Sequence, residues 1–553
     1  MRALVERLGG FLPAAIALAL PTVFIPFAVD SYILPRAGIV IAGAGLGCGL
    51  ALLLPGGPTL GRLRLPLIAA AAAALLAFAF SVSWPLSLEG SYTRYESLPI
   101  RLAYLGLLAA PVWLLRDQAS RERVIPAFVI GTTIASFQAL GQSALLLNHS
   151  IAYRPDGNLG NANLLGALLS MAIPLAFARG LHAPKLGVPW WAALVVMTGA
   201  VVATTSRSGG LGAVAGCLAV IVFMLRGKQA LIGATAALAV VATGLALIVF
   251  SPLRFLNDDP GAARLHLWSD AIRMIAARPL TGWGEDATGV VYGRFLSGDW
   301  APEVDRAHSG PLDIAATQGV IGLVALAWVL VTLIRGFWRW RHAGSIGPLA
   351  AACLGYTVWV VFNFDWAPAT GVFWLLAGTA WSGVRAAESA TPPIPSTTRS
   401  GSHSAGLGSK AAFRGLDGAR LAPSVRFARS IGAAALAAGV IWLGAMPVLA
   451  DVWYYQSRLD LSVIVDPLQG RYHWVLGQGL VAMGSTSRGL TQFQLAAKLG
   501  ESDPQLYVDL GDADQRLGHT TEAQAAYRMA VLIDPYFLPA RDRLAGKGVP
   551  PSG

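Results

Sequence analysis

One apolar run decides the fold class of this chain: Val320-Ile321-Gly322-Leu323-Val324-Ala325-Leu326-Ala327-Trp328-Val329. It lies within a longer segment, 312–334, that can cross about 30 Å of hydrocarbon as a helix. Similar runs, rich in Ala and Leu, recur along the chain, whereas a β-barrel would need short strands of alternating polarity. The sequence therefore predicts an all-α, polytopic membrane protein.

The composition agrees with this prediction. Of the 553 residues 55% are hydrophobic and 13% are charged, and the mean hydropathy is +0.57, whereas soluble domains carry about 25% charged residues. The net charge of +11 does not indicate nucleic-acid binding, because Lys and Arg are concentrated in short loops beside the apolar runs. The cysteines lie far apart in apolar segments, which is typical of small buried side chains: Cys48, Cys217 and Cys353.

About thirteen membrane-spanning helices are expected by this criterion. The first is interpreted as a helix that stays in the membrane, because no small-residue cleavage site followed by a soluble domain is present. The expected spans lie near residues 11–30, 37–55, 66–83, 99–115, 124–147, 163–178, 189–205, 209–225, 229–250, 312–334, 347–362, 368–384 and 430–450.

Charge placement predicts the topology. If the N-terminus is cytoplasmic, every short basic loop falls on the cytoplasmic side, as the positive-inside rule requires. The loops 84–98, 148–162 and 251–311 and all residues after 450 are then extracytoplasmic. The cytoplasmic basic residues would be Arg62, Arg64, Arg116, Arg121, Arg123, Arg179, Lys185, Arg226, Lys228, Arg335, Arg339 and Arg341.

Composition divides the chain into four parts. Residues 1–384 form the membrane part, and 385–429, basic and rich in Ser, Gly, Pro and Ala, predict a disordered cytoplasmic linker. A last span, 430–450, leads to residues 451–553, which have the composition of a soluble domain. Asp-Pro pairs recur there at spacings near the period of about 34 residues of tetratricopeptide repeats. We therefore expect a small extracytoplasmic α-helical domain that docks or binds a protein partner.

Arg264 is the first candidate site residue. On a helix ending before Pro279, Arg264 and Trp268 share a line with apolar residues, while His266, Ser269, Asp270 and Arg273 would take the opposite face. An inward guanidinium favours a bidentate anion such as phosphate, with Trp268 beside it as a substrate contact. The alternatives are snorkelling to the interface and a structural carboxylate partner.

Arg207 is the second candidate. The segment Thr204-Thr205-Ser206-Arg207-Ser208-Gly209-Gly210 joins two spans with almost no loop, on the predicted outer side. Ser206 or Ser208 can cap the following helix, whose N-terminal N–H groups also attract anions. The alternative is an interfacial Arg that contacts lipid head groups.

His308 is the third candidate. It precedes Ser309-Gly310-Pro311, a helix start with Pro in the first turn. The positive end of that helix favours a neutral imidazole, which suits a general base near neutral pH. A structural role is the alternative for a lone His.

The remaining candidates for substrate binding lie in outer loops or at a helix start. The two Asn residues open a helix, and their alternative role is ordinary capping. No phosphate-binding loop, HExxH, CxxC or nucleophile elbow is present, and the acidic residues of the large loop have no metal-site spacing. These further candidates are Arg306, Arg154, Arg94, Asn161 and Asn163.

Together these motifs resemble the O-antigen ligase and polymerase superfamily of membrane glycosyltransferases, over roughly residues 60–385. The family commonly has Asn directly after the His, where this chain has Ser309. The matching pieces are Gly160-Asn161-Ala162-Asn163, Thr205-Ser206-Arg207-Ser208-Gly209, Arg264 with Trp268, Arg278-Pro279-Leu280-Thr281-Gly282-Trp283-Gly284, Arg306-Ala307-His308-Ser309 and Gln318-Gly319-Val320-Ile321-Gly322-Leu323.

The resemblance implies a GT-C-like bundle in a bacterial cytoplasmic membrane. It implies that a glycan passes from undecaprenyl pyrophosphate to a hydroxyl of a glycan, lipid or protein acceptor on the outer face, with inversion and without metal or cofactor. Arg207 and Arg264 would hold the pyrophosphate, and His308 would accept the acceptor's proton. Lipopolysaccharide ligation, polysaccharide polymerisation and protein O-glycosylation share these motifs, so they stay open. A non-catalytic scaffold for envelope glycan assembly and a flippase are the alternatives.

Overall fold

The computed structural model describes residues 2–54, 59–147, 154–182, 187–250, 261–299, 305–390, 423–548 and 550, and these residues form helices and no strands. A helix overlaps each of the thirteen expected spans. The helices are α1 (Arg2–Thr22), α2 (Ile33–Leu53), α3 (Arg64–Ala79), α5 (Leu98–Leu114), α6 (Gln118–Leu147), α7 (Ala162–His182), α8 (Val188–Thr204), α9 (Arg207–Met224), α10 (Gly227–Phe250), α13 (Gly310–Trp340), α14 (Ile346–Val360), α15 (Ala367–Ala390) and α16 (Pro423–Val440) continued by η4 (Ile441–Ala445) and α17 (Met446–Tyr455).

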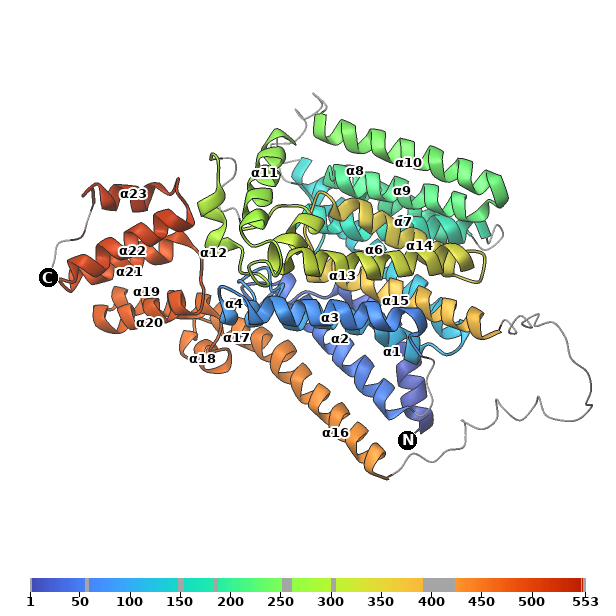
Figure 1. The fold of residues 1–553 in the computed structure, drawn as a ribbon, viewed down its shortest axis with the longest axis horizontal. Coiled ribbons are helices and arrows are strands. Elements are labelled where there is room, and N and C mark those ends of the chain that lie inside the picture. Colours follow the sequence, from blue (N-terminus) through green and yellow to red (C-terminus); the bar gives the residue numbers. More distant parts are fainter. Residues whose placement is uncertain are drawn as a thin grey trace, which may run out of the picture.

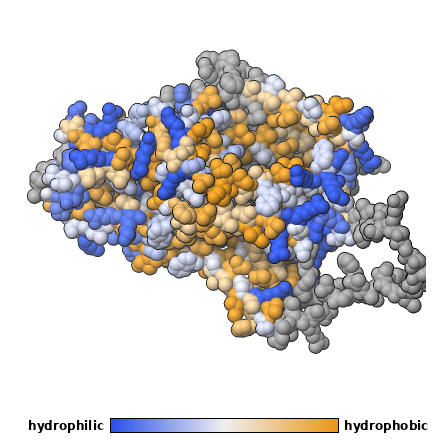
Figure 2. Space-filling view, in the orientation of Figure 1, coloured by the Kyte–Doolittle hydropathy of each residue, from blue (hydrophilic) through white to orange (hydrophobic). Residues whose placement is uncertain are grey.

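The chain is a polytopic helical membrane protein. Eight of its described helices are long and apolar enough to cross a membrane, and α5, α8 and α14 are shorter apolar helices. The long helices run alongside one another, and the short C-terminal helices gather at one end of the bundle (Figure 1). Hydrophobic side chains cover the middle of the face seen in Figure 2, with hydrophilic ones towards both ends, as expected for a bundle with a lipid-facing belt.

The two ends of the bundle differ in what they carry. We call the end where α5, α7, α9, α13 and α15 begin the site end, and the other the basic end. The basic residues expected in the cytoplasm lie at the basic end wherever they are described, so the charge pattern is one-sided. Which end faces the cytoplasm remains a prediction.

The linker is shorter than expected. Helix α15 continues through Ala390, helped by an ion pair one turn apart between Arg385 and Glu388, and α16 already begins at Pro423. Both ends of the expected linker, 385–390 and 423–429, are therefore helical. Residues 391–422, which make up the rest of it, lie outside the described part of the chain.

The large loop before α13 contains the helices α11 (Gly261–Ala277), α12 (Gly289–Tyr292) and η3 (Gly293–Phe295). Its stretch 279–284 forms backbone hydrogen bonds with α13 where that helix is broken at Gly319, whose φ is 67°. The N–H of Trp283 donates to Ala316 O over 2.9 Å, and that of Val320 to Pro279 O over 2.8 Å. A Cβ on Gly319 would lie 2.2 Å from Leu280 O, so only glycine fits this crossing. Two motifs that the sequence presents separately thus form one backbone-paired unit.

Close glycine contacts position the start of α9. A Cβ on Gly209 would lie 2.7 Å from Gly166 Cα in α7, and one on Gly212 would lie 2.5 Å from Gly355 O in α14. Small residues allow membrane helices to approach closely where lipid gives no hydrophobic drive for association. The backbone around Arg207 is therefore fixed by three packed helices.

The C-terminal region packs on the site end. It contains the short helices α18 (Leu459–Val465), α19 (Gly470–Ala482), α20 (Thr486–Lys498), α21 (Pro504–Arg516), α22 (Thr520–Ile533) and α23 (Leu538–Leu544). Helix α19 packs against α20, and α21 against α22, although their assignment as tetratricopeptide repeats stays a prediction. The buried carboxylate of Asp451 accepts hydrogen bonds from the Tyr92 hydroxyl over 2.6 Å and the Asp30 N–H over 2.8 Å. This region is thus attached to the loops of the membrane part.

Candidate functional site

The turn between α14 and α15 gathers most of the candidate residues. We call residues 361–366, Val361-Phe362-Asn363-Phe364-Asp365-Trp366, the central segment. The Phe362 ring lies 5.8 Å from the ring of Trp268 in α11. The Asn363 amide donates to Ser208 Oγ over 3.1 Å, next to Arg207. The central segment therefore connects α11 with the start of α9.

Phe364 in this segment brings three further candidates together. The guanidinium carbons of Arg94 and Arg306 lie 4.8 Å and 5.5 Å from the centre of its ring. The His308 imidazole meets the same ring edge-on, with 5.2 Å between the ring centres. Cations within about 6 Å of an aromatic face are attracted to it, so Phe364 holds these side chains around one point.

His308 itself has an unusual backbone. Its φ is 51°, in the left-handed region that few residues other than glycine adopt and that His tolerates better than most. The N–H of the preceding Ala307 donates to Asp313 Oδ1 over 2.9 Å, and α13 begins two residues later at Gly310. A non-glycine residue held in this region is a frequent feature of functional sites. The imidazole is half-buried and lies at the N-terminus of α13, as the sequence predicted.

Arg207 is the first residue of α9, and Ser206 is the helix cap, accepting a hydrogen bond from Gly209 N over 3.3 Å. This confirms the predicted capping. Arg207 is half-buried, and within the described ranges it forms no ion pair. It lies at the N-terminal end of a helix, whose N–H groups and dipole favour an anion.

Arg154, Asn161 and Asn163 lie next to this helix start. Arg154 Nη2 donates to Asn163 Oδ1 over 2.9 Å, and Arg154 Nε donates to Thr204 O over 3.0 Å. Asn161 Oδ1 accepts from Asn163 N over 2.8 Å, as a capping residue does. The Ser206 hydroxyl also contacts Asn163. The structure therefore brings these three candidates to Arg207 and uses them to hold the turn before α9.

Helix α11 carries Arg264 and Trp268, both half-buried, one turn apart. The expectation for Asp270 was wrong. It is fully buried instead of lying on the outer face, because Ser297 supplies hydrogen bonds from its N–H and hydroxyl and Arg273 forms an ion pair with it. Trp268 Nε1 is buried without a hydrogen-bond partner in the described part of the chain. A buried donor without a partner is costly, so this N–H is suited to donate a hydrogen bond to a bound ligand.

Arg306 and Arg94 are paired with carboxylates. Arg306 is 2% exposed and forms an ion pair with Asp286. Arg94 Nε donates to Asp305 Oδ2 over 2.7 Å. Burial alone would raise the pKa of Asp305, but Arg94 and Arg306 outweigh this effect and lower it. These pairings favour a supporting role for both arginines over direct contact with a substrate.

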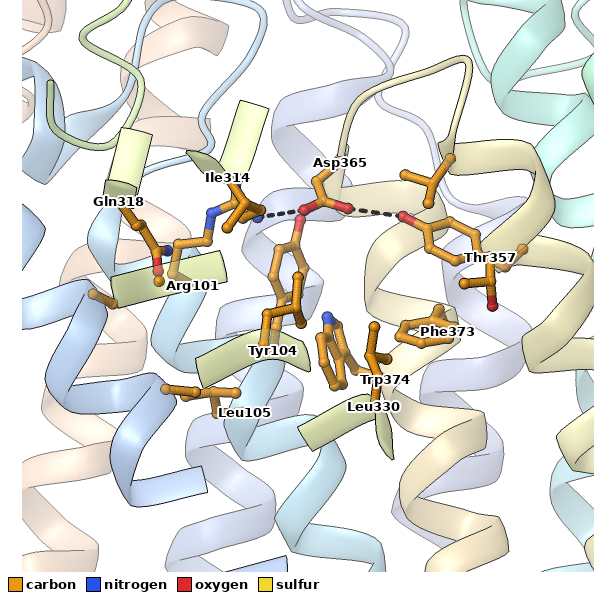
Figure 3. A pocket seen from close by; sticks show the side chains of 16 residues that line it. Arg101, Tyr104, Leu105, Ile314, Gln318, Leu330, Thr357, Asp365, Phe373 and Trp374 are labelled. Carbon is orange, nitrogen blue, oxygen red and sulfur yellow. Dashed lines mark hydrogen bonds and ion pairs between the residues drawn. The ribbon is translucent and has the colours of Figure 1, made fainter. Parts of the chain in front are cut away.

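Arg101 is a functional-site residue that the sequence reasoning missed. It is 7% exposed and contacts three carboxylates: Asp365 over 2.6 Å, Glu285 over 3.1 Å and Glu96 over 3.6 Å. Figure 3 shows Asp365 joined to Arg101, and both side chains line a small cavity of about 100 Å³. A charged residue inside an expected span, here 99–115, is the signal that could have found it.

Three carboxylates surround the single guanidinium of Arg101. Burial raises the pKa of Glu96 to about 7 and also raises the pKa of Glu285, because a low-dielectric surrounding disfavours the charged form and Arg101 offsets this only in part. Glu285 Oε1 also accepts a hydrogen bond from the Gln318 amide, in the same motif that pairs with residues 279–284. The site thus rests on a buried network of charged and polar groups.

Among the residues that the structure describes, no group of three or more His, Cys, Asp or Glu side chains is arranged to hold a metal ion. The three carboxylates around Arg101 contact its guanidinium. Metal independence nevertheless stays a prediction for this chain.

Comparison with known proteins gives one finding for the site. Residues 192–327 match the family described as O-antigen ligase. The match contains Arg207, Arg264, Trp268, Arg306 and His308, whereas the central segment and the C-terminal helices lie beyond it. No curated protein matches the chain.

Proposed function

We propose that this chain, a member of the O-antigen ligase superfamily by its match over residues 192–327, transfers a glycan from an undecaprenyl pyrophosphate carrier to an acceptor hydroxyl. Members of this superfamily process lipid-linked glycans in membranes. The observation that carries the finer proposal is the central segment, which joins the surroundings of Arg207, Trp268 and His308 at one end of the bundle. Transfer takes place at this end, on the extracytoplasmic side.

The donor's pyrophosphate binds between α9 and α11. Arg207 adds its charge to the N–H groups at the start of α9, and Arg264 approaches from α11 with Trp268 one turn away. Both guanidinium groups can form two parallel hydrogen bonds to phosphate oxygens. Because negative charge grows on the bridging oxygen as the sugar leaves, cations at this position stabilise the transition state more than the bound donor.

His308 acts on the acceptor. The acceptor oxygen forms a bond to the anomeric carbon from the face opposite the leaving group, and the bond from that carbon to the pyrophosphate oxygen breaks. The hydroxyl proton passes to the imidazole, and undecaprenyl pyrophosphate leaves with the electron pair of the broken bond. The configuration at the anomeric carbon is inverted. The charges balance without a redox partner or further co-reactant.

The buried network supports this geometry. Phe364 contacts His308 directly, and Arg306 and Arg94 are held on the same ring by Asp286 and Asp305. These groups orient the catalytic side chain without touching the substrate. Residues 279–284 and the break in α13 at Gly319, which are joined by backbone hydrogen bonds, are part of the same support.

The experiment compares surface glycan and lipid-linked glycan in a deletion strain that expresses wild-type chain, Arg207→Ala, Arg264→Ala or His308→Ala at equal protein levels. We expect each variant to lose transfer and to accumulate lipid-linked glycan on the outer face, detected by mass spectrometry. Arg335→Ala, at the basic end, is the matched control and should transfer normally. Unchanged surface glycan in all three site variants would falsify the proposal, and glycan trapped inside would indicate a flippase.

The same glycan pool identifies the acceptor. Glycan joined to a lipid indicates ligation, longer glycan chains on the carrier indicate polymerisation, and glycosylated protein indicates protein O-glycosylation. Deleting the C-terminal helices separately tests the scaffold alternative. A scaffold would lose all function on that deletion while tolerating the three substitutions.

A further inference from the structure

A second polar cavity lies at the basic end, at the opposite end of the bundle from His308. Its volume is about 440 Å³. It is enclosed by the start of α6, the ends of α7 and α9, and the connection from α13 to α14. We call it the basic pocket, and its charged lining residues are Glu122, Arg179, Arg226 and Arg341.

The basic pocket has an excess of positive charge. Of its three arginines, Arg179 forms an ion pair with Glu122, which leaves the charges of Arg226 and Arg341 without a carboxylate among the described lining residues. The Nε atoms of Arg179 and Arg341 are buried and have no hydrogen-bond partner in that part of the chain. Unsatisfied buried donors on cations are costly and indicate a missing acceptor.

Two histidines also line the pocket, and one of them, the exposed His342, lies beside Arg341 and Arg226. Partial desolvation lowers the pKa of His342, and the charges of Arg341 and Arg226 lower it further, because both effects disfavour the charged imidazole. The excess of arginines and their unsatisfied buried donors, more than this shift, indicate a pocket arranged for an anion.

An apolar cavity of about 380 Å³ lies next to the basic pocket, between α9, α10, α13, α14 and α15. Phe223 lines both cavities. Its ring lies 6.0 Å from the ring of Trp338, which lines the apolar cavity, and the Arg341 guanidinium lies 4.3 Å from the centre of the Trp338 ring. The two cavities thus form one site with a cationic mouth and an apolar interior.

We propose that this site binds an anionic glycerophospholipid, with its phosphate in the basic pocket and an acyl chain in the apolar cavity. Basic pockets between membrane helices attract anionic head groups. A soluble phosphate compound would leave the apolar cavity unfilled. The carrier lipid of the proposed reaction would have to place its phosphate at the end opposite Arg207 and His308. The site is therefore separate from the proposed catalytic one and holds a lipid of the surrounding leaflet.

The test uses the purified full-length chain, stripped of lipid in detergent. It is titrated with phosphatidylglycerol and with phosphatidylcholine of the same acyl chains, and bound lipid is counted by native mass spectrometry. We expect preferential binding of phosphatidylglycerol, weakened about fivefold by Arg341→Ala, the effect of one cation near an anionic lipid. The matched control Arg335→Ala, an exposed arginine of α13 outside the pocket, should bind like the wild type.

Competition experiments distinguish a long-chain phospholipid from other phosphate-containing ligands. Inorganic phosphate and dihexanoyl phosphatidylglycerol, whose chains are too short to fill the apolar cavity, should compete poorly with the long-chain lipid. Equal binding of both head groups, equal loss in Arg335→Ala, or effective competition by either short probe overturns the proposal. So does displacement by undecaprenyl phosphate at equal or lower concentration. If Arg341→Ala does not fold, Arg226→Ala, in the loop after α9, replaces it.

Discussion

Two sets of arginines at the site end are chemically alike but differently placed. Arg101 and Arg306 are almost fully buried, and each is in contact with carboxylates. Arg207 and Arg264 are half-buried on the first turns of α9 and α11, beside helix N-termini and the unpaired indole N–H of Trp268. The first set is neutralised from within the chain. The second set is more accessible and lies at the starts of two helices, where we propose that an anion from outside the chain binds.

Because of this difference, substituting the two sets of arginines should have different consequences for stability and for transfer. Removing one partner of a buried ion pair leaves an uncompensated charge and destabilises the fold by about 3–5 kcal/mol. Removing a half-buried cation that binds the substrate should change stability much less and should mainly lower the rate. Measuring the unfolding temperature and the transfer rate of the same variants therefore tests whether the two sets of arginines differ in this way.

The largest effect on transfer is expected for His308→Ala. Losing a general base typically lowers the rate by about 10²–10⁴-fold, and the fold should remain because the imidazole is half-buried. Transfer rate with a lipid-linked donor and thermal unfolding in detergent are the two measurements. A variant that unfolds at much lower temperature would show that the left-handed residue is structural instead.

The next effect is expected for Arg207→Ala and Arg264→Ala. Each should lower transfer by about 10²–10³-fold through lost stabilisation of the leaving pyrophosphate, with an unfolding temperature close to that of the wild type. The Lys variants should recover part of the rate, since they restore charge but not two parallel hydrogen bonds. If Lys and Ala variants are equally impaired, charge is not what these positions contribute.

Arg306→Met should act on stability first. We expect about 3–5 kcal/mol of destabilisation, measured as lower yield and unfolding temperature, because Asp286 would be left buried without its cation. Arg294→Met, at an exposed position of η3, is the control and should change little. Adding Asp286→Asn should restore part of the stability. If the Arg306→Met variant is as stable as the wild type but does not transfer, Arg306 contacts the substrate instead of supporting the fold.

The smallest effect concerns the carboxylates of the buried network. The pKa of Glu96 is raised to about 7 in the folded chain, above its value of about 4.3 when unfolded. The folded state therefore holds this proton more tightly, so its contribution is complete at low pH and is lost as pH rises through that interval. The slope is at most about 1.4 kcal/mol per pH unit. Glu96→Gln should flatten the stability profile between pH 5 and 7, and an unchanged profile contradicts the shift.

The sequence was sufficient for features set by local patterns. Hydropathy located a helix at each expected span, and His308 was placed directly before α13. Ser206 was one of two serines expected as a helix cap, and it is the one that caps α9. These depend on periodicity and capping within a few residues. They need no knowledge of which helices are neighbours.

Features that depend on distant partners were missed or wrong. Asp270 was expected on the outer face of α11, and only the position of Ser297 explains its burial. Residues 279–284 and the Gly319 turn appeared as separate motifs because their pairing is tertiary. The central segment has no motif of its own. Its side chains become informative only when α9, α11 and α13 are packed around it.

The central segment also predicts how the site meets its ligands. Six residues connect two tightly packed helices, and their side chains are fixed by contacts with α5, α9 and the residues before α13. Little conformational entropy is then left to lose when substrate binds, so recognition here approaches lock-and-key behaviour. Changes of glycan specificity among related chains should accordingly arise in the loops that surround this turn, while the turn itself keeps the same geometry.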